Sequence, residues 1–153
     1  MPSACRARQR LAVIIPYRDR ARHLRLLLSY LHPFLQRQMR HYQIFVVEQA
    51  YDETFNKGMI MNVAFTEVMR RGRWDCIVFH DVDMVPENDR NIYECMRQPR
   101  HLSPGVDVLR YVLMYSDLVG GALALTPTQV VRTNGYSNLY WGWGAEDDDM
   151  YMR

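Results

Sequence analysis

Two aspartates separated by one residue follow an apolar segment and could bind a divalent cation. The segment Cys76–Phe79 reads CIVF, and His80, Asp81, Val82 and Asp83 come directly after it. Because alternate side chains of an extended chain point the same way, both carboxylates are expected to face one site. Hard cations prefer oxygen ligands and often bridge to substrate phosphates. The pattern predicts a metal site, and its alternative is a pair of solvated loop acids.

A second acidic group stands near the end of the sequence, after a tryptophan-glycine segment. Trp141-Gly142-Trp143-Gly144 and Ala145 precede the four acids Glu146, Asp147, Asp148 and Asp149. Neighbouring carboxylates repel one another, which raises their pKa values. A carboxylate with a raised pKa, beside an aromatic ring that stacks on sugar, suits a general base. The alternative is that the acids occupy the first turn of a helix, where they offset its dipole.

Two further segments carry groups that suit phosphate or a base. Arg18 and Arg20 lie in Pro16-Tyr17-Arg18-Asp19-Arg20, and their spacing would aim both guanidinium groups to one side of an extended turn. In Phe55-Asn56-Lys57 an aromatic ring could stack on a base and the only lysine of the chain could meet phosphate. The alternatives are a surface charge pair and an ordinary loop before a helix.

The elements that must position these residues alternate along the first half of the chain. Apolar runs predict buried strands at residues 11–15, 44–47 and 76–79. Leucines on one helical face predict a helix over 24–35, which Pro33 is expected to kink or end, and a second helix is predicted over 57–70. This order predicts a parallel sheet with helices on its faces. Ligands of such sheets bind beyond the carboxyl ends of the strands, where the motifs stand.

The second half is less regular. Val108–Tyr115 is predicted as a strand that Gly120-Gly121 interrupts, and Ala122–Leu125 as another strand. Thr126-Pro127 predicts a helix start and Asn134-Gly135 its stop.

Bulk properties bound the class of protein. The chain has 153 residues, the size of one domain, and a net charge of +2, which gives no argument for a nucleic-acid or membrane partner. No apolar stretch is long enough to span a bilayer. Residues 1–10 are polar and basic, without the apolar core of a signal peptide, and are expected to be a lead-in from a missing N-terminal region. The three cysteines, Cys5, Cys76 and Cys95, fit no zinc pattern, and their pairing stays open.

Read in chain order, PYRDR, TFNKG, FHDVD, the glycine pair at 120–121 and WGWGAEDDD resemble the β-1,4-galactosyltransferase family. The resemblance runs from about Cys5 to the last residue, and it is greatest to the family's N-acetylgalactosaminyltransferase branch. It implies an α/β glycosyltransferase-A fold: a Rossmann-like twisted, mostly parallel sheet with flanking helices. It also implies an inverting enzyme that uses Mn²⁺ and a UDP-sugar donor. Residues 11–153 would then be a catalytic domain truncated at its C-terminus, since the family's histidine metal ligand and mobile lid lie downstream of EDDD.

The resemblance also implies roles for individual residues. Asp147 would be the base that takes the proton from the acceptor's 4-hydroxyl, with Glu146 beside it, and Asp83 would be the metal ligand. The expected acceptor-sugar contacts are Ala145, Glu146, Asp147, Asp148 and Tyr115. The expected donor contacts are Pro16, Tyr17, Arg18, Asp19, Arg20, Phe55, Asn56, Lys57, Asp81, Val82, Trp143 and Leu118.

Two departures from the family bear on specificity. Ala145 replaces a glycine of many members, and its methyl group is expected to narrow the acceptor pocket. Leu118 stands where galactose-specific members have a tyrosine that limits room for the donor's 2-substituent. The expected reaction is therefore transfer of GalNAc from UDP-GalNAc to the 4-hydroxyl of a terminal GlcNAc. The alternatives are a galactosyltransferase that uses UDP-Gal and an inactive UDP-sugar-binding fragment.

A pairing of the cysteines is implied only by the family resemblance. Cys76 and Cys95 match a family disulfide that flanks the metal motif, and Cys5 matches a cysteine whose partner lies upstream of this chain. Disulfides imply the secretory route. Family members are Golgi type II membrane proteins, so a lumenal catalytic domain is expected, with a membrane anchor that is not in this chain.

Overall fold

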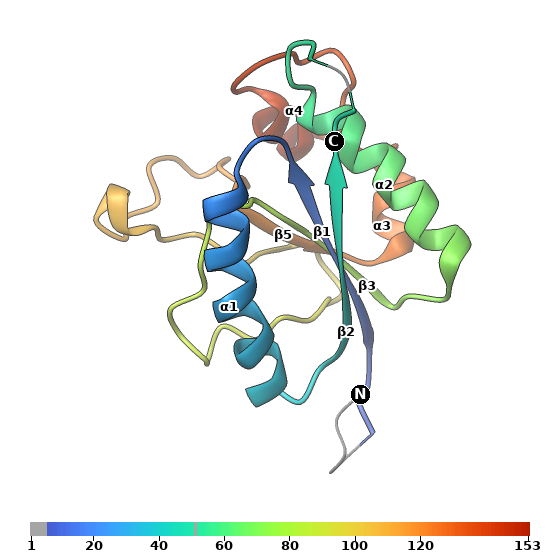
Figure 1. The fold of residues 1–153 in the computed structure, drawn as a ribbon, viewed down its shortest axis with the longest axis vertical. Helices are drawn as coiled ribbons and strands as arrows, with labels where there is room; N and C mark the ends of the chain where they lie inside the picture. The colour runs from blue at the N-terminus through green and yellow to red at the C-terminus, as the bar shows by residue number, and fades with distance from the viewer. Residues whose placement is uncertain (1–5, 51) are drawn as a thin grey trace.

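A five-stranded sheet forms the centre of the molecule, with helices on both of its faces (Figure 1). The computed structural model describes residues 6–50 and 52–153. The elements are β1 (Arg10–Tyr17), α1 (Ala21–Arg37), β2 (His41–Glu48), α2 (Lys57–Arg71), β3 (Cys76–His80), β4 (Arg100–His101), the 3₁₀ turn η1 (Asp107–Leu109), β5 (Ala122–Leu125), α3 (Pro127–Arg132) and α4 (Glu146–Met152).

The strand order confirms the expected fold class. The sheet runs β2-β1-β3-β5-β4. β1 pairs in parallel with both β2 and β3, whereas β5 pairs antiparallel with β3 and β4. The first half is therefore the predicted β-α-β-α-β unit. The carboxyl ends of β1, β2 and β3 meet at one edge of the sheet, from which PYRDR, the 49–57 loop and the HDVD motif all leave.

Each face of the sheet has its own core. One core joins α1 to the sheet and includes Leu27, Leu31, Val13 and Val78, all fully buried. The other joins α2, α3 and α4 to the opposite face, and Figure 1 shows α1 on one side of the strands and α2 and α3 on the other. Alternate side chains of a strand point to opposite faces, so each strand feeds both cores.

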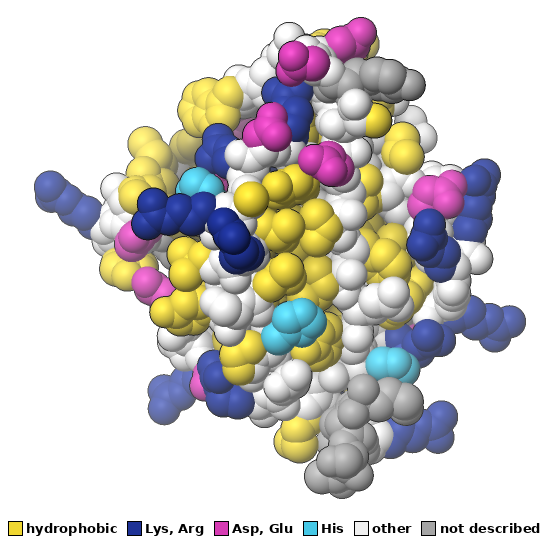
Figure 2. All heavy atoms as spheres, in the orientation of Figure 1, with side chains coloured by type: hydrophobic (Ala, Val, Ile, Leu, Met, Phe, Trp, Pro, Cys, Tyr) yellow, Lys and Arg dark blue, Asp and Glu magenta, His cyan; other side chains and the backbone are white. Residues whose placement is uncertain are grey.

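β2 is one of the two edge strands of the described sheet, and it also contributes to both cores. Ile44 packs against the α1 core and Phe45 against the α2 core. Figure 2 shows hydrophobic side chains gathered on this face, over β2 and between α1 and α2.

Pro33 does not end the first helix, and one predicted strand is absent. Pro33 lies inside α1, which continues to Arg37. Pro33 is exposed, while Leu31, Phe34 and Leu35 on the opposite side of the helix are buried and hold it against the sheet. No strand forms at Val108–Tyr115, where η1 and turns stand instead. That apolar run is exposed rather than buried, so apolar composition alone misled the prediction.

Other details of the fold bear on the expectations. Thr126 begins α3 with a reciprocal capping box that involves Gln129, which confirms the predicted start. Cys76 and Cys95 form a disulfide that ties the start of β3 to the segment before β4. Cys5 lies outside the described residues. Among the residues described, no helix has the length and apolar character needed to cross a membrane.

Candidate active site

A cavity of about 540 Å³ opens at the carboxyl ends of β1 and β3. This volume falls within the range of small-molecule sites. It brings together residues from four separate parts of the sequence, including most of the predicted donor residues. The lining is Pro16, Arg18, Arg20, Thr54, Phe55, Lys57, Asp81, Val82, Asp83, Gly142, Trp143 and Glu146.

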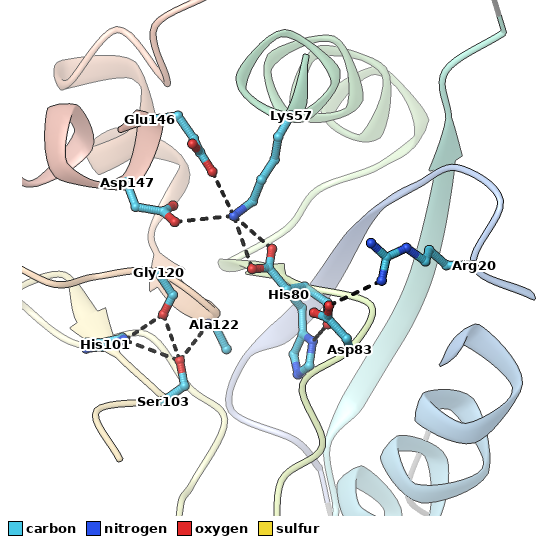
Figure 3. Close-up of polar contacts among 11 residues, drawn as sticks. Arg20, Lys57, His80, Asp83, His101, Ser103, Gly120, Ala122, Glu146 and Asp147 are labelled. Carbon is cyan, nitrogen blue, oxygen red and sulfur yellow. Dashed lines mark hydrogen bonds and ion pairs between the residues drawn. The ribbon is translucent and has the colours of Figure 1, made fainter. Parts of the chain in front are cut away.

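One lysine stands at the centre of the charged groups (Figure 3). The Nζ atom of Lys57 lies 2.9 Å from Oδ1 of Asp81, 3.1 Å from Oε1 of Glu146 and 3.4 Å from Oδ2 of Asp147. The lysine side chain is 16% exposed, so solvent screens these contacts little. Lys57 thus joins the end of β3 to the start of α4.

The local sequence around Lys57 explains its fixed position. Asn56, almost fully buried, caps α2: its side chain accepts from the backbone N–H of Met59 and donates to the carbonyl of Asn138. Gly58 lies against the 134–138 turn so closely that a Cβ atom would stand 2.4 Å from the carbonyl oxygen of Ser137. The first turn of α2 is therefore held against that turn.

The charge cluster shifts the pKa values of its members. Burial raises the pKa of Asp147 to about 6; Lys57 opposes this rise, while Glu146 and Asp81 add to it. Burial also raises the pKa of Asp81, again opposed by Lys57. Burial alone would lower the pKa of Lys57, but the surrounding carboxylates outweigh it and raise that pKa. The lysine is therefore charged at neutral pH, and Asp147 titrates close to neutrality.

The four consecutive acids occupy the first turn of α4, and they have different partners. Glu146 and Asp147 pair with Lys57. Asp148 accepts a hydrogen bond of 2.8 Å from the Tyr115 hydroxyl. Asp149 pairs with Arg153. The helix-dipole alternative thus applies to all four acids, while only two of them also face the lysine.

Asp83 differs from Asp81 in its environment. Residues 82 and 83 form a turn rather than a continued strand. The Asp83 side chain is 51% exposed and lies 3.8 Å from Arg20, which also lines the cavity. Within 6–50 and 52–153, no three His, Cys, Asp or Glu side chains are grouped to hold a metal ion. An exposed carboxylate in the cavity wall, such as that of Asp83, suits a cation that is shared with substrate phosphates.

The remaining cavity wall is aromatic and cationic. The Arg18 guanidinium lies over the Phe55 ring, 5.2 Å from its centroid, and donates to the carbonyl of Glu53. Trp143 is fully exposed at the cavity. The rings of Phe55 and Trp143 could stack on a planar base or a sugar, beside arginines that suit phosphate.

A buried pair behind the metal motif holds its backbone. His80 Nδ1 lies 2.8 Å from the carbonyl oxygen of Asp81, and Nε2 lies 3.0 Å from the Tyr93 hydroxyl. Burial lowers the pKa of His80 to about 4, so the ring is neutral at pH 7. Because a carbonyl only accepts, Nδ1 carries the proton and Nε2 accepts from Tyr93. Nothing in the sequence pattern signals this pair.

The glycine pair before β5 lies against Asp147. His101 and Ser103 both donate to the carbonyl oxygen of Gly120, at 2.7 and 2.9 Å (Figure 3). The carbonyl oxygen of Gly121 accepts from the backbone N–H of Asp81 at 2.7 Å. These bonds fix the backbone on which the Asp147 carboxylate rests.

Some residues singled out from the sequence do not line the cavity. Asp147 lies behind it, beside Lys57, and Asn56 is an internal helix cap. Leu118 is half-buried in the loop before β5 and is not part of the cavity wall. Tyr17, Asp19, Tyr115, Ala145 and Asp148 are likewise outside that wall. Sequence reasoning missed Thr54 in the wall and Tyr136, whose burial raises its pKa beside Asp147.

Comparison with known proteins gives two matching family models and close relatives. Residues 1–96 match the N-terminal region of glycosyl transferase group 7, and residues 100–153 match the N-terminal domain of galactosyltransferase. The chain is 49% identical over 152 residues to human β-1,4-galactosyltransferase 4 and 50% identical over 153 residues to human β-1,4-galactosyltransferase 3. Each alignment covers 99% of this chain but only 44% and 39% of the relatives, so the chain spans less than half of their length.

Solved structures agree with the fold. A Drosophila β-1,4-galactosyltransferase 7 mutant, in complex with manganese, UDP-Gal and xylobiose, matches with a TM-score of 0.83 and 34% identity, over 94% of this chain and 59% of that chain. A mannosyltransferase from Pyrobaculum calidifontis, in complex with GDP-Man and Mn²⁺, matches with a TM-score of 0.63 at 17% identity, over 94% of this chain and 51% of that chain. The second match concerns the fold alone.

Proposed function

We propose, from the premise that this chain belongs to glycosyl transferase group 7, that it provides the donor-binding and base-carrying part of a manganese-dependent hexosyltransferase. The reaction is transfer of a hexose from a UDP-sugar to the 4-hydroxyl of a terminal GlcNAc, with inversion at the anomeric carbon. Relatives named as β-1,4-galactosyltransferases support this assignment.

One observation carries the proposal. A single cavity contains Arg18, Arg20 and Asp83, which suit a diphosphate with its cation, and Trp143, which suits a sugar face. Asp147, a carboxylate with a pKa of about 6, lies behind this cavity. It is paired with Lys57, which lines the cavity wall. A donor site and a base of suitable pKa are thus adjacent, as a one-step displacement requires.

The residues have distinct tasks in this reaction. Asp147 accepts the proton of the acceptor hydroxyl as that oxygen attacks the anomeric carbon, and the UDP oxygen leaves from the opposite face. Arg18 and Arg20 hold the donor diphosphate. Asp83 would bind manganese, which when present neutralises the developing charge on the diphosphate. The fly β-1,4-galactosyltransferase 7 mutant was solved in complex with manganese and UDP-Gal, which supports this choice of metal and donor class.

Glu146, Asp148, Tyr115 and Ala145 are proposed acceptor contacts. The Tyr115 hydroxyl donates a hydrogen bond to Asp148, which orients one polar group of the proposed acceptor site. GlcNAc as the acceptor sugar rests on the family resemblance. The xylobiose in the fly complex supports a sugar acceptor but a different one.

UDP-galactose is the first candidate donor, because the named relatives are galactosyltransferases. UDP-GalNAc is the second candidate, and the specific observation in its favour is Leu118, which lacks the ring and hydroxyl of the tyrosine that it replaces. Since Leu118 lies outside the cavity wall, its effect would have to pass through the neighbouring Gly120-Gly121 segment.

A lumenal location in the Golgi completes the proposal. The Cys76–Cys95 disulfide supports a secretory compartment, because such bonds persist in oxidising environments. A type II membrane anchor outside this chain remains a prediction from the family resemblance.

The test is a manganese-dependent transfer assay on a GlcNAc-terminated acceptor, with UDP-Gal and UDP-GalNAc side by side. Transfer of either sugar that stops on chelation of the metal supports the enzyme, and the faster donor decides the specificity. UDP binding measured by calorimetry without any transfer would instead support an inactive UDP-sugar-binding protein.

A further inference from the structure

We infer that Lys57 is a positioning residue, whose ammonium group holds the Asp147 carboxylate against the end of β3 and does not itself bind the donor phosphates. The inference rests on the proposed function, since Asp147 is the base of that reaction. It assigns to Lys57 a task different from the phosphate contact that its place in the sequence suggests.

Carboxylates of the protein surround the Lys57 ammonium group. A lysine ammonium has three N–H donors and no acceptor. Three carboxylates surround the Lys57 Nζ atom within 3.4 Å, one each from Asp81, Glu146 and Asp147. Nζ donates hydrogen bonds to Asp81 and Asp147 and forms an ion pair with Glu146, so its charge and its donors face carboxylates of the protein. Arg18 and Arg20, by contrast, are available at the same cavity for phosphate.

These three carboxylates need a cation between them. Asp81 comes from the end of β3, and Glu146 and Asp147 come from α4. Carboxylates that surround one atom repel one another strongly when they are buried. The Lys57 ammonium is the positive group that holds the two segments together, and its own backbone is fixed by the Asn56 cap at the start of α2.

Lys57 also acts on the pKa of the base itself. The titratable groups coupled to Asp147 come from several parts of the fold: Lys57 on α2, Asp81 directly after β3, His101 on β4, Tyr115 in the loop before β5, Tyr136 in the turn after α3 and Glu146 on α4. Lys57 alone among them opposes the rise in the Asp147 pKa that burial causes. The lysine therefore keeps the base ionised near neutral pH as well as in place.

The test compares three variants of the intact protein in transfer assays from about pH 5 to 9. Lys57→Met removes the charge and keeps the length; Lys57→Arg keeps the charge. Arg70→Met is the matched control, since Arg70 lies at the other end of the same helix in an exposed pair with Glu67. Lys57→Gln replaces Lys57→Met if the latter does not fold.

The expected result separates positioning from phosphate binding. Lys57→Met lowers kcat at pH 7 by about 10- to 100-fold, and the acid limb of its pH profile moves up by at least about one pH unit. The donor KM changes by less than about threefold. Lys57→Arg restores the position of the acid limb, and Arg70→Met behaves as the unchanged protein.

A raised donor KM with an unmoved acid limb would overturn the inference, because it would mean that Lys57 binds donor phosphate. A second readout needs no activity: an NMR titration of ¹³C-labelled Asp147 in the protein without donor or metal. If the unchanged protein transfers no sugar, the proposed function fails, while an upward shift of the Asp147 pKa in Lys57→Met still supports the positioning role. No shift in that titration contradicts it.

Discussion

Gly120 and Asp147 touch so closely that a Cβ atom on Gly120 would lie 2.6 Å from Oδ2 of the aspartate. The glycine is needed for space at this point. Its carbonyl is fixed by His101 and Ser103, so the backbone cannot easily move away. The carboxylate, as the end of a side chain, would have to shift away from Lys57 instead.

Gly120→Ala is therefore expected to displace the base while leaving the fold in place. A misplacement of about 1 Å can cost about 100-fold in rate, so kcat should fall by about 10- to 100-fold. The melting temperature should change by no more than a few degrees. Gly72→Ala is the matched control, since a Cβ there meets only ordinary contacts at 3.7–3.9 Å. Full activity in Gly120→Ala would mean that Asp147 is not the base.

The pH dependence of transfer should report Asp147. Its pKa of about 6 means that the base is protonated below that pH, so kcat/KM should fall about tenfold for each pH unit on the acid side. Asp147→Asn should lose about 10²- to 10⁴-fold in kcat above pH 6, and its remaining activity should lack this acid limb. An acid limb centred near pH 4 would show that the carboxylate has an ordinary pKa.

The same pKa has a consequence for stability. The folded protein binds this proton more tightly than the unfolded chain, in which the ordinary value of 3.8 applies. Stability from this group is therefore present at low pH and is lost as pH rises from about 4 to 6. Asp147→Asn should accordingly raise the free energy of unfolding at pH 7 by about 1–3 kcal/mol, with no gain below pH 4. Urea unfolding at the two pH values checks the sign.

Ala145 is a non-glycine residue with φ of 73°, in the left-handed region. Such a conformation costs a residue with a side chain about 1–2 kcal/mol. Glycine avoids this cost, but its unfolded chain has more conformational entropy, which offsets part of the gain. Ala145→Gly should raise the free energy of unfolding by about 0.5–1 kcal/mol. Ala21→Gly, at the exposed start of α1, is the control and should not stabilise. Unchanged stability of Ala145→Gly would mean that the strain is relieved elsewhere.

This strain also illustrates what the sequence could and could not predict. The WGWGAEDDD motif drew attention to Ala145, but only the structure shows its left-handed backbone conformation. Its side chain lies outside the wall of the donor cavity, and the narrowing of the acceptor pocket stays a prediction. Similarly, periodic apolar runs predicted β1, β2, β3, β5 and the two long helices, because each of them has to bury a face.

Contacts between distant segments were beyond such patterns. The two-residue β4 is too short for a periodic signal, and the exposed run at Val108–Tyr115 has apolar residues without a core to cover. The Lys57 cluster joins residues up to 90 positions apart. The motifs located those residues individually, whereas the pairing of one ammonium with three carboxylates follows only from the packing of α2, β3 and α4.

Donor choice offers the last test. Leu118 lies two residues before Gly120, and its backbone N–H donates to the carbonyl of Tyr115, so it links a proposed acceptor contact to the glycine beside the base. Leu118→Tyr adds a ring and a hydroxyl at this point. If the loop shapes the space around the donor's 2-substituent, the variant should lower kcat/KM for UDP-GalNAc relative to UDP-Gal by about tenfold or more, the scale of steric discrimination in a pocket.

Leu113→Tyr makes the same change at an exposed position of the same loop, and its donor ratio should stay unchanged. The ratio of kcat/KM values, measured with both donors in competition, removes any loss of folded protein from the comparison. A ratio for Leu118→Tyr within about threefold of the unchanged protein would make Leu118 a packing residue. Donor choice would then have to come from the cavity wall itself, where Phe55 and Trp143 are the side chains to vary next.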